Sequence, residues 1–466
     1  MSQPNILLFV SDQHRADFIE GEGDPQISTT NLRRLADQGT VFERCLTTCP
    51  LCVPARMSLI TGRAPHNLDS FSNASALHSQ IPTFAHALGL AGYRTVLAGR
   101  MHFMGGDQFH GFDERLVGDV CGGHLGQNRA EYRFRGYYGQ PPCVDGDGAG
   151  LSHDQYFDQA VAVESCRLIR DHEVSQDERP LLLVLGFYSP HDPYRVRDKY
   201  FRKYSEAGEL PDFYKNKSEI HAADKWLHEI CGWDKLPEES IKKARAGYRG
   251  KTEFLDDLIG QVVECFEESP FGDNGVIAYT SDHGDMLGDH GIWGKSRFYE
   301  EAVRVPLIVA GPGIEKGRVK QAVSLMDIAP TLADLAGAKP IPAVEGVSLV
   351  PSLRGEGAPE RQIFSELDGS KRMVVDGKWK YIYYHGEAPS LFNLEDDPRE
   401  LNDLAGSPEL ADIEAKLKEA VFADGWNVER NLEHIEEMKA YQQYLGEWAQ
   451  KVEVKDPVQW GLPAEL

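Results

Sequence analysis

The sequence has no long apolar run and few basic residues. Its first apolar stretch, Ile6–Val10, follows no basic segment and ends at a Ser-Asp pair, so we predict a strand rather than an export signal or a membrane span. Lysine and arginine total 49 against 73 aspartates and glutamates, which gives a formal net charge of -24. This acidity excludes broad binding to nucleic acid or to an anionic membrane, but it allows a local basic pocket for one small anion.

Cysteine is also scarce, with 8 in 466 residues. Scattered cysteines in a long chain without an export signal are typical of reduced thiols, so we expect a cytoplasmic protein without a disulfide framework. No internal repeat is visible. The length exceeds what one hydrophobic core usually covers, so we expect one large domain and a smaller one.

Apolar strand-like runs alternate with helical patterns over the first three quarters of the chain. Strands are predicted at Ile6–Val10, Thr95–Leu97, Pro180–Tyr188, Val276–Thr280 and Val305–Ala310, and helices at Asn31–Gln38, Tyr156–Asp171, Leu236–Ser269 and Asp327–Leu335. This alternation predicts an α/β fold with a large, mostly parallel sheet sandwiched by helices. Ligands of such folds bind at the carboxyl ends of the strands.

The pattern changes after about residue 358. Short strands separated by Asp-Gly turns are predicted at Gln362–Leu367, Arg372–Val375 and Lys378–Tyr384, and a helix at Pro408–Val421. We therefore expect a large domain at 1–358, a small C-terminal α+β domain with an antiparallel sheet at 359–424, and a C-terminal arm at 425–466. The arm is expected to pack on a partner subunit, giving a homo-oligomer, or over the mouth of the site, near a long loop at Gly136–Gly150.

The most informative segment contains Cys52, Pro54 and Arg56 in a C-x-P-x-R pattern, followed by L-x-T-G-R. The fixed φ of Pro54 suits the first turn of a helix, which places Cys52 at a helix N-terminus. The free amides and the dipole at such an end stabilise an anionic nucleophile or an oxyanion, and Arg56 adds a positive fork.

Two other interpretations of Cys52 stay open at this point. It is a small buried apolar residue in one of them, as most free cysteines are. In the other, the C-x3-C-x2-C spacing of Cys45, Cys49 and Cys52 holds three irons of a four-iron cluster in a radical enzyme. A hard-metal, oxyanion site elsewhere in the chain would favour an anionic nucleophile at Cys52, whereas a cluster-binding barrel would favour the iron–sulfur interpretation.

Polar side chains at two predicted strand ends form that hard-metal site. Asp12 and Gln13 follow the first strand, and Asp282 and His283 follow the strand Val276–Thr280. Two carboxylates, an amide oxygen and an imidazole form a mixed, mostly oxygen shell. We predict one divalent metal here, with Ca favoured, Mg or Mn as alternatives, and zinc disfavoured.

The Cys52 motif resembles the signature of the type I sulfatases, which have an alkaline-phosphatase-like fold. The resemblance runs from Pro4 to about Leu404 and is nearest to the choline-sulfatase and phosphonate-monoester-hydrolase branch, in which Gln13 replaces the family's second aspartate. It implies that a formylglycine-generating maturation enzyme oxidises Cys52, that residue 52 joins the metal shell, and that the protein hydrolyses a small sulfated substrate.

The resemblance also implies the rest of the pocket. Arg100 and His102 lie where the family has Gly-Lys-x-His, His191 lies in a Pro-His-x-Pro motif, and Lys295 follows the Asp-His-Gly turn. The residues expected to be catalytic are Cys52, Arg56, His102, His191 and Lys295, and those expected to bind substrate are Arg100 and Asn73.

The substrate stays open between a sugar sulfate and a small organic sulfate. Choline sulfate would need aromatic faces, for which Trp293 and Tyr194 are candidates, whereas Trp293-Gly-Lys295 resembles carbohydrate sulfatases. The alternatives in other classes are a phosphonate monoester or phosphodiester hydrolase on the same fold, a radical iron–sulfur enzyme, and a binding protein whose Cys52 is never matured.

Overall fold

An eight-stranded sheet forms the centre of the molecule in a computed structural model that describes residues 3–121, 123, 148–172, 177–206, 208–216, 220–452 and 458–461. Its strand order is β12-β2-β11-β9-β1-β7-β4-β5. The strands are β1 (Asn5–Asp12), β2 (Thr40–Phe42), β4 (Arg94–Gly99), β5 (Glu114–Val117), β7 (Leu181–Pro190), β9 (Gly275–Ser281), β11 (Leu307–Ala310) and β12 (Gly317–Val319). Only β11 is antiparallel to its neighbours, so the prediction of a mostly parallel sheet is confirmed.

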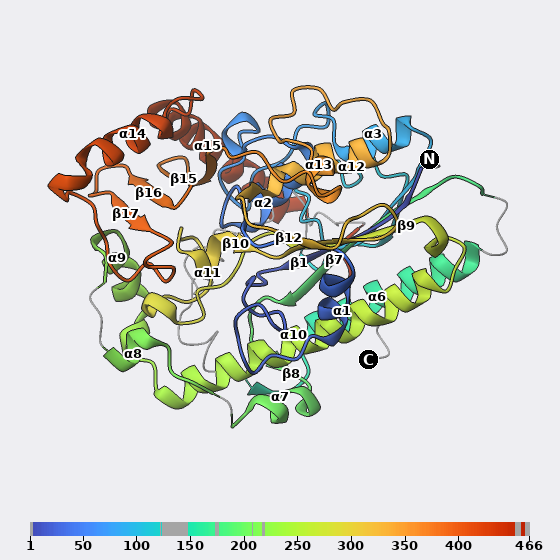
Figure 1. The fold of residues 1–466 in the computed structure, drawn as a ribbon, viewed down its shortest axis with the longest axis horizontal. Coiled ribbons are helices and arrows are strands. Elements are labelled where there is room, and N and C mark those ends of the chain that lie inside the picture. Colours follow the sequence, from blue (N-terminus) through green and yellow to red (C-terminus); the bar gives the residue numbers. More distant parts are fainter. Residues whose placement is uncertain are drawn as a thin grey trace.

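Helices cover both faces of this sheet (Figure 1). One face carries α2 (Cys52–Thr61), α3 (Phe84–Leu90) and α12 (Ile328–Leu335), and the other carries α1 (Thr30–Gln38), α6 (His153–His172) and α10 (Glu238–Glu267). Strand β1 shows why: Ile6 and Leu8 join the first core, whereas Leu7 and Phe9 join the second. A strand buried on both faces has a continuous apolar sequence, as this one has.

The predicted strand Val305–Ala310 is two strands, β10 (Arg304–Val305) and β11. Pro306 separates them, because proline donates no hydrogen bond to a sheet ladder. Strand β10 belongs instead to a small sheet of order β10-β3-β13, with β3 (Cys45–Leu46) and β13 (Val323–Ser324). This small sheet holds the segment that leads to Cys52.

A second, antiparallel sheet follows in the order β14 (Ile363–Leu367), β15 (Lys371–Asp376), β16 (Trp379–Tyr384) and β17 (Ser390–Asn393). Helix α14 (Ala411–Val421) packs on it. The amide of Glu366 in β14 donates to the Thr48 carbonyl at 2.9 Å, so this sheet also supports the approach to Cys52. Most of the arm is one helix, α15 (Val428–Val452).

The connecting elements lie mainly between β7 and β9. They are β6 (Gly148–Ala149), β8 (Arg195–Val196), α7 (Asp198–Tyr204), α8 (Asp212–Asn216) and α9 (Ala222–Cys231), followed later in the chain by α11 (Glu300–Val303) and α13 (Val350–Leu353). Most of the loop predicted at Gly136–Gly150 lies outside the described residues. Among the described helices, none combines the length and apolarity that crossing a bilayer requires.

Candidate active site

Four consecutive parallel strands deliver the candidate site residues from their carboxyl ends. In the order β9, β1, β7 and β4, these ends lead directly to Asp282, Asp12, His191 and Arg100. The register explains the convergence, because Ser11 pairs with Ser281 and Asp12 pairs with Pro190. Residues hundreds of positions apart in the sequence therefore meet at one edge of the sheet, as expected for an α/β fold.

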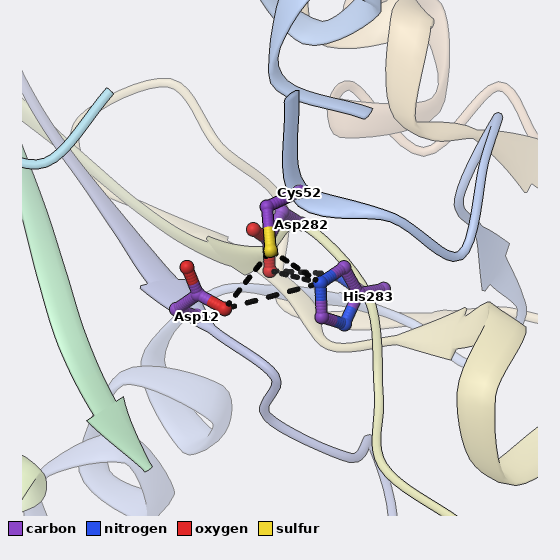
Figure 2. A group of neighbouring side chains, drawn as sticks. All are labelled: Asp12, Cys52, Asp282 and His283. Atoms are coloured by element: carbon purple, nitrogen blue, oxygen red, sulfur yellow. Dashed lines mark hydrogen bonds and ion pairs between the residues drawn. The ribbon is translucent and has the colours of Figure 1, made fainter. Parts of the chain in front are cut away.

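The N-terminus of α2 points at this edge and completes a group of four potential metal ligands (Figure 2). One ligand atom each from Asp12, Cys52, Asp282 and His283 lies within 4.8 Å of the others. All four side chains are buried. It is the one group of at least three such residues that the described part of the chain contains. The helix start predicted at Cys52 is confirmed.

The surroundings of Cys52 favour a negative charge at this position. Its Sγ lies 3.2 Å from His283 Nε2 and 3.7 Å from Asp12 Oδ1. Burial raises the pKa of the Cys52 thiol, but the charges of Lys295 and His283 and hydrogen bonds to His102 and His191 outweigh it, so the pKa lies well below its ordinary value. An oxyanion at the same place would be stabilised by the same groups.

Arg56 forms ion pairs with Asp12 and Asp282, the two carboxylates among the four potential metal ligands. Its Nε donates to Asp282 Oδ2 at 2.9 Å, and its Nη2 donates to Asp12 Oδ2 at 3.2 Å. The guanidinium is fully buried, and it also donates to the Arg100 carbonyl at 2.9 Å. Arg56 thus orients both carboxylates and balances their charge, rather than opening a free fork toward a substrate.

The Arg100 guanidinium also forms hydrogen bonds with protein groups. From the sequence, we expected it to bind sulfate oxygens instead. Its Nε donates to Asp12, its Nη1 donates to Asp119 and to Cys121 Sγ, and its Nη2 lies 3.0 Å from His102 Nδ1. The guanidinium lies over the Tyr188 ring at 5.0 Å. Arg100 therefore positions Asp12 and His102.

Lys295 forms the cationic centre of a second network. Its Nζ lies 2.6 Å from both Gln13 Oε1 and His191 Nε2. Burial lowers the pKa of Lys295, but the Cys52 and Asp12 charges outweigh this and raise it, so the ammonium stays protonated. The Gln13 amide, expected in the metal shell, lies between Lys295 and Asp285, to which its Nε2 donates at 2.6 Å.

The side chains of Asn73, Tyr194 and Trp293, the remaining candidates from the sequence, form hydrogen bonds with other protein groups. Asn73 Oδ1 accepts from the Val53 amide at 3.0 Å, so it satisfies a free donor in the first turn of α2. The two aromatic candidates are buried: Tyr194 donates to Asp285, and Trp293 donates to Tyr214 at 2.9 Å. They form no aromatic cage at the site.

The iron–sulfur interpretation of the three cysteines is wrong. Cys45 belongs to the apolar core under α2, whereas Cys49 belongs to the core shared with the second sheet. Neither thiol joins Cys52 in the ligand group among the described residues. The interpretation of Cys52 as an ordinary core residue does not fit either, because its neighbours are carboxylates, imidazoles and an ammonium.

Two acidic residues of this region were not singled out from the sequence. Asp285 lies two positions after His283, and it accepts hydrogen bonds from Gln13 and Tyr194. Asp119 follows β5 and binds Arg100 and the His102 amide. For Asp285, the Asp-His-Gly-Asp run was a usable signal, whereas nothing in the local pattern marks Asp119.

Comparisons with known proteins agree with this geometry. The sulfatase family model matches residues 4–338, and the model of the N-sulphoglucosamine sulphohydrolase C-terminal region matches residues 288–424. A choline-sulfatase from Rhizobium meliloti (strain 1021) is 36% identical over 432 residues, covering 87% of this chain and 83% of its own.

Two further relatives extend the comparison. The multifunctional alkaline phosphatase superfamily protein PehA of Trinickia caryophylli is 28% identical over 485 residues, covering 88% of this chain and 93% of its own. The phosphonate monoester hydrolase of Agrobacterium radiobacter has the same fold, with a TM-score of 0.74 at 23% identity over 90% of this chain and 95% of its own. The chain belongs to the sulfatase family, and it is a hydrolase acting on sulfate esters.

Proposed function

We propose that this protein hydrolyses a sulfate monoester with a formylglycine nucleophile made from Cys52 and one divalent metal. The observation that carries the proposal is the convergence of Asp12, Cys52, Asp282 and His283 at the N-terminus of α2. Buried cations stand directly beside this group. The arrangement suits an anionic substrate and a nucleophile that reacts as an oxyanion.

The donor set of the four residues fits the proposed metal. Two carboxylates and one imidazole, with the oxygen of a matured residue 52, favour Ca, and Mg or Mn are the alternatives. When bound, such a cation acts as a Lewis acid and favours the deprotonated form of the nucleophile. Arg56 holds Asp12 and Asp282 in the orientation that this binding requires.

The other site residues act on the proton and on the departing group. Lys295 is protonated and in contact with His191, so this pair donates to the oxygen of the departing alcohol. His102 forms a hydrogen bond with the side chain of residue 52, which places it to remove the proton of the second hydroxyl of the hydrated aldehyde. Loss of that proton releases sulfate and restores the aldehyde.

The maturation of Cys52 is directly testable by mass spectrometry. Co-expression with a formylglycine-generating enzyme should replace the thiol in the tryptic peptide containing residue 52 with an aldehyde. Turnover should rise in proportion to the converted fraction, and Cys52→Ala should be inactive. Full turnover by a protein that retains an unmodified Cys52 would contradict the proposed nucleophile.

The proposed substrate class is a sugar sulfate or a small organic sulfate. Because Trp293 and Tyr194 are buried, they do not favour a trimethylammonium group, although the choline-sulfatase of Rhizobium meliloti is a relative. Matured protein should be assayed with choline sulfate, an aryl sulfate and sulfated mono- and disaccharides. Absence of turnover with every sulfate ester would refute the proposed reaction.

A phosphonate monoester or phosphodiester hydrolase is the second candidate. It is favoured by the Asp12-Gln13 pair and by the 26% identity to the phosphonate monoester hydrolase SpPMH from Silicibacter pomeroyi, whose structure matches with a TM-score of 0.73. Parallel assays with an aryl sulfate and an aryl phosphonate monoester distinguish the two functions. We expect the sulfate to have the higher kcat/KM, and the reverse order would assign the second function.

A further inference from the structure

A buried carboxylate outside the group of four potential metal ligands connects Arg100 and His102, which lie just after β4. Asp119 is only 2% exposed. Its Oδ2 accepts from the His102 amide at 2.7 Å, and its Oδ1 accepts from Arg100 Nη1 at 3.4 Å and from the Cys121 amide at 3.0 Å. One side chain therefore fixes the backbone of His102 and the guanidinium of Arg100 together.

The backbone of His102 needs such a constraint. Its φ is 59°, in the left-handed region that residues other than glycine rarely adopt. A conformation of this kind persists only where surrounding contacts impose it. The amide hydrogen bond to Asp119 is such a contact, and the imidazole that it orients lies beside Arg100 and residue 52.

The C-terminal end of the chain holds Asp119 from the other side. We call residues 458–461 the C-terminal strap. The Asp119 amide donates to the Val458 carbonyl at 3.2 Å, and the Trp460 amide donates to the Asp119 carbonyl at 2.8 Å. The close approach requires Gly118, since a Cβ there would lie 1.6 Å from the Val458 oxygen.

Aromatic packing anchors the strap to the main body. The Trp460 ring lies 4.9 Å from the His153 ring and 5.5 Å from the Phe157 ring, both in α6. Helix α6 packs directly against β7 and β4. The strap is thus attached to the same layer that supports the strands of the site, and it pairs with Asp119 just after the edge strand β5.

We propose that Asp119 is a positioning residue for His102 and Arg100, and that the C-terminal strap maintains its position. This inference rests on the proposed function, because it assigns Asp119 a role through residues of that site. Asp119 itself contacts neither the metal group nor residue 52 in the hydrogen bonds and ion pairs of the described chain. Its effect passes through Arg100 and His102.

The test is a double-mutant cycle on matured, full-length protein. Asp119→Asn keeps the shape but removes the charge, and a chain ending at Val452 lacks the strap. Each change should lower kcat for an aryl sulfate at least tenfold, with KM changed less than threefold. Because both changes act on the same loop, the double variant should lose no more than the worse single variant.

Two controls separate positioning from general damage. Asp113→Asn changes a half-exposed carboxylate just before β5, and a chain ending at Gly461 keeps the strap. Both should retain kcat within twofold. Full kcat in Asp119→Asn, or losses that multiply in the double variant, would overturn the proposal.

Hydrogen exchange gives a readout that does not depend on turnover. Amides in the peptide 100–104 should exchange faster in Asp119→Asn and in the chain ending at Val452 than in the wild type and the two controls. Unchanged exchange would overturn the inference even if the enzyme is a sulfatase. Faster exchange in these two variants, combined with a wild-type protein that hydrolyses no sulfate ester, would support the inference while refuting the proposed function.

Discussion

At the scale of single residues, the site depends on two arginines that face carboxylates rather than substrate. Arg56 is fully buried and paired with Asp12 and Asp282. Removing one partner of a buried ion pair leaves an uncompensated charge, which is more costly than the loss of a surface contact. We therefore expect Arg56 to contribute to folding as well as to the proposed activity, although its place in the motif suggested mainly a catalytic role.

Arg56→Ala should lower both stability and turnover. We expect the free energy of unfolding to fall by about 3 to 5 kcal/mol, because Asp282 loses its arginine and Asp12 keeps only Arg100. Turnover should fall by at least on the order of 100-fold. Denaturant unfolding and an aryl sulfate assay measure the two effects. Arg63→Ala, at a partly exposed ion pair with Glu345, is the control and should cost less than about 1 kcal/mol.

Lys295→Ala should reduce turnover in a way that depends on the leaving group. If the ammonium protonates the departing oxygen, the loss should be on the order of 100- to 1000-fold for an alkyl sulfate. It should be much smaller for an aryl sulfate with an acidic phenol, which leaves without a proton. A series of aryl sulfates measures this trend. An equal loss along the whole series would contradict the assigned role.

The residues of the metal group were predictable from sequence because each immediately follows or begins a regular element. Asp12 ends β1, Asp282 and His283 follow the adjacent strand β9, and Cys52 starts α2. The orientations of Gln13 and Arg100 were not predictable, because they depend on Asp285 and Asp119 from distant loops. Residue type constrains what a side chain can bind, but tertiary contacts select the partner.

At the scale of elements, α2 begins with Cys52, the proposed nucleophile position, and is fixed at both ends. Asn73 binds its first turn, and Gly62 ends it with a φ of 70°. The Gly62 carbonyl accepts from the amides of Glu345 and Gly346 at 2.7 and 2.9 Å. The helix is therefore held in one axial position relative to the sheet.

Gly62→Ala should destabilise the protein by about 1 to 3 kcal/mol. A Cβ at this position would lie 2.5 Å from Val344 Cγ2, and the backbone conformation disfavours any side chain. Thermal unfolding measures the effect. Gly89→Ala is the matched control, because it lies inside α3 with open space around it and should be neutral or slightly stabilising.

Long elements with a strong apolar pattern and the short strands of the second sheet were predicted well, whereas several strands of two or three residues were not. The helices α6 and α10 and the strands β1, β7 and β9 lie within a few residues of their predicted bounds. Strands β2, β3 and β12 have two or three residues each, which is too short for a periodic pattern. Their pairing depends on distant partners, so only the structure reveals them.

At the scale of the whole molecule, a buried charge cluster joins the second sheet to the rest. Lys380 in β16 lies 3.0 Å from Glu300 in α11 and 2.8 Å from Glu400. Burial raises the pKa of Glu400 to about 8, although the Lys380 charge opposes this shift. The folded protein therefore keeps a proton on Glu400 at pH values where the unfolded chain has lost it.

This cluster predicts a pH dependence of stability. Between about pH 4.5 and pH 8 the folded state binds one more proton at Glu400, so stability should fall as pH rises through this window. The contribution is at most about 1.4 kcal/mol per pH unit. Stability can be measured by thermal unfolding at a series of pH values. Glu400→Gln should remove this part of the decrease of stability with pH, whereas the exposed control Glu409→Gln should retain it.

We expect the molecule to self-associate through helix α15. Tyr441, Tyr444 and Trp448 are 60%, 74% and 43% exposed and share one face of the helix. Exposed aromatic stripes of this kind mark interaction surfaces. The double variant Tyr444→Asp and Trp448→Asp should have a lower mass by light scattering, whereas Leu90→Asp, at an exposed residue of α3, should not. An identical mass for all proteins would contradict this interface.

The burial of Cys52 restricts the proposed maturation to a limited time during synthesis. Its side chain and all of α2 are covered in the folded chain, so a modifying enzyme must reach the thiol earlier. Strand β9, which completes the metal group, leaves the ribosome roughly 10 to 45 s after Cys52 at ordinary elongation rates. That interval limits the time in which the modifying enzyme can act on the thiol. Faster translation should therefore yield a larger fraction of folded but inert protein.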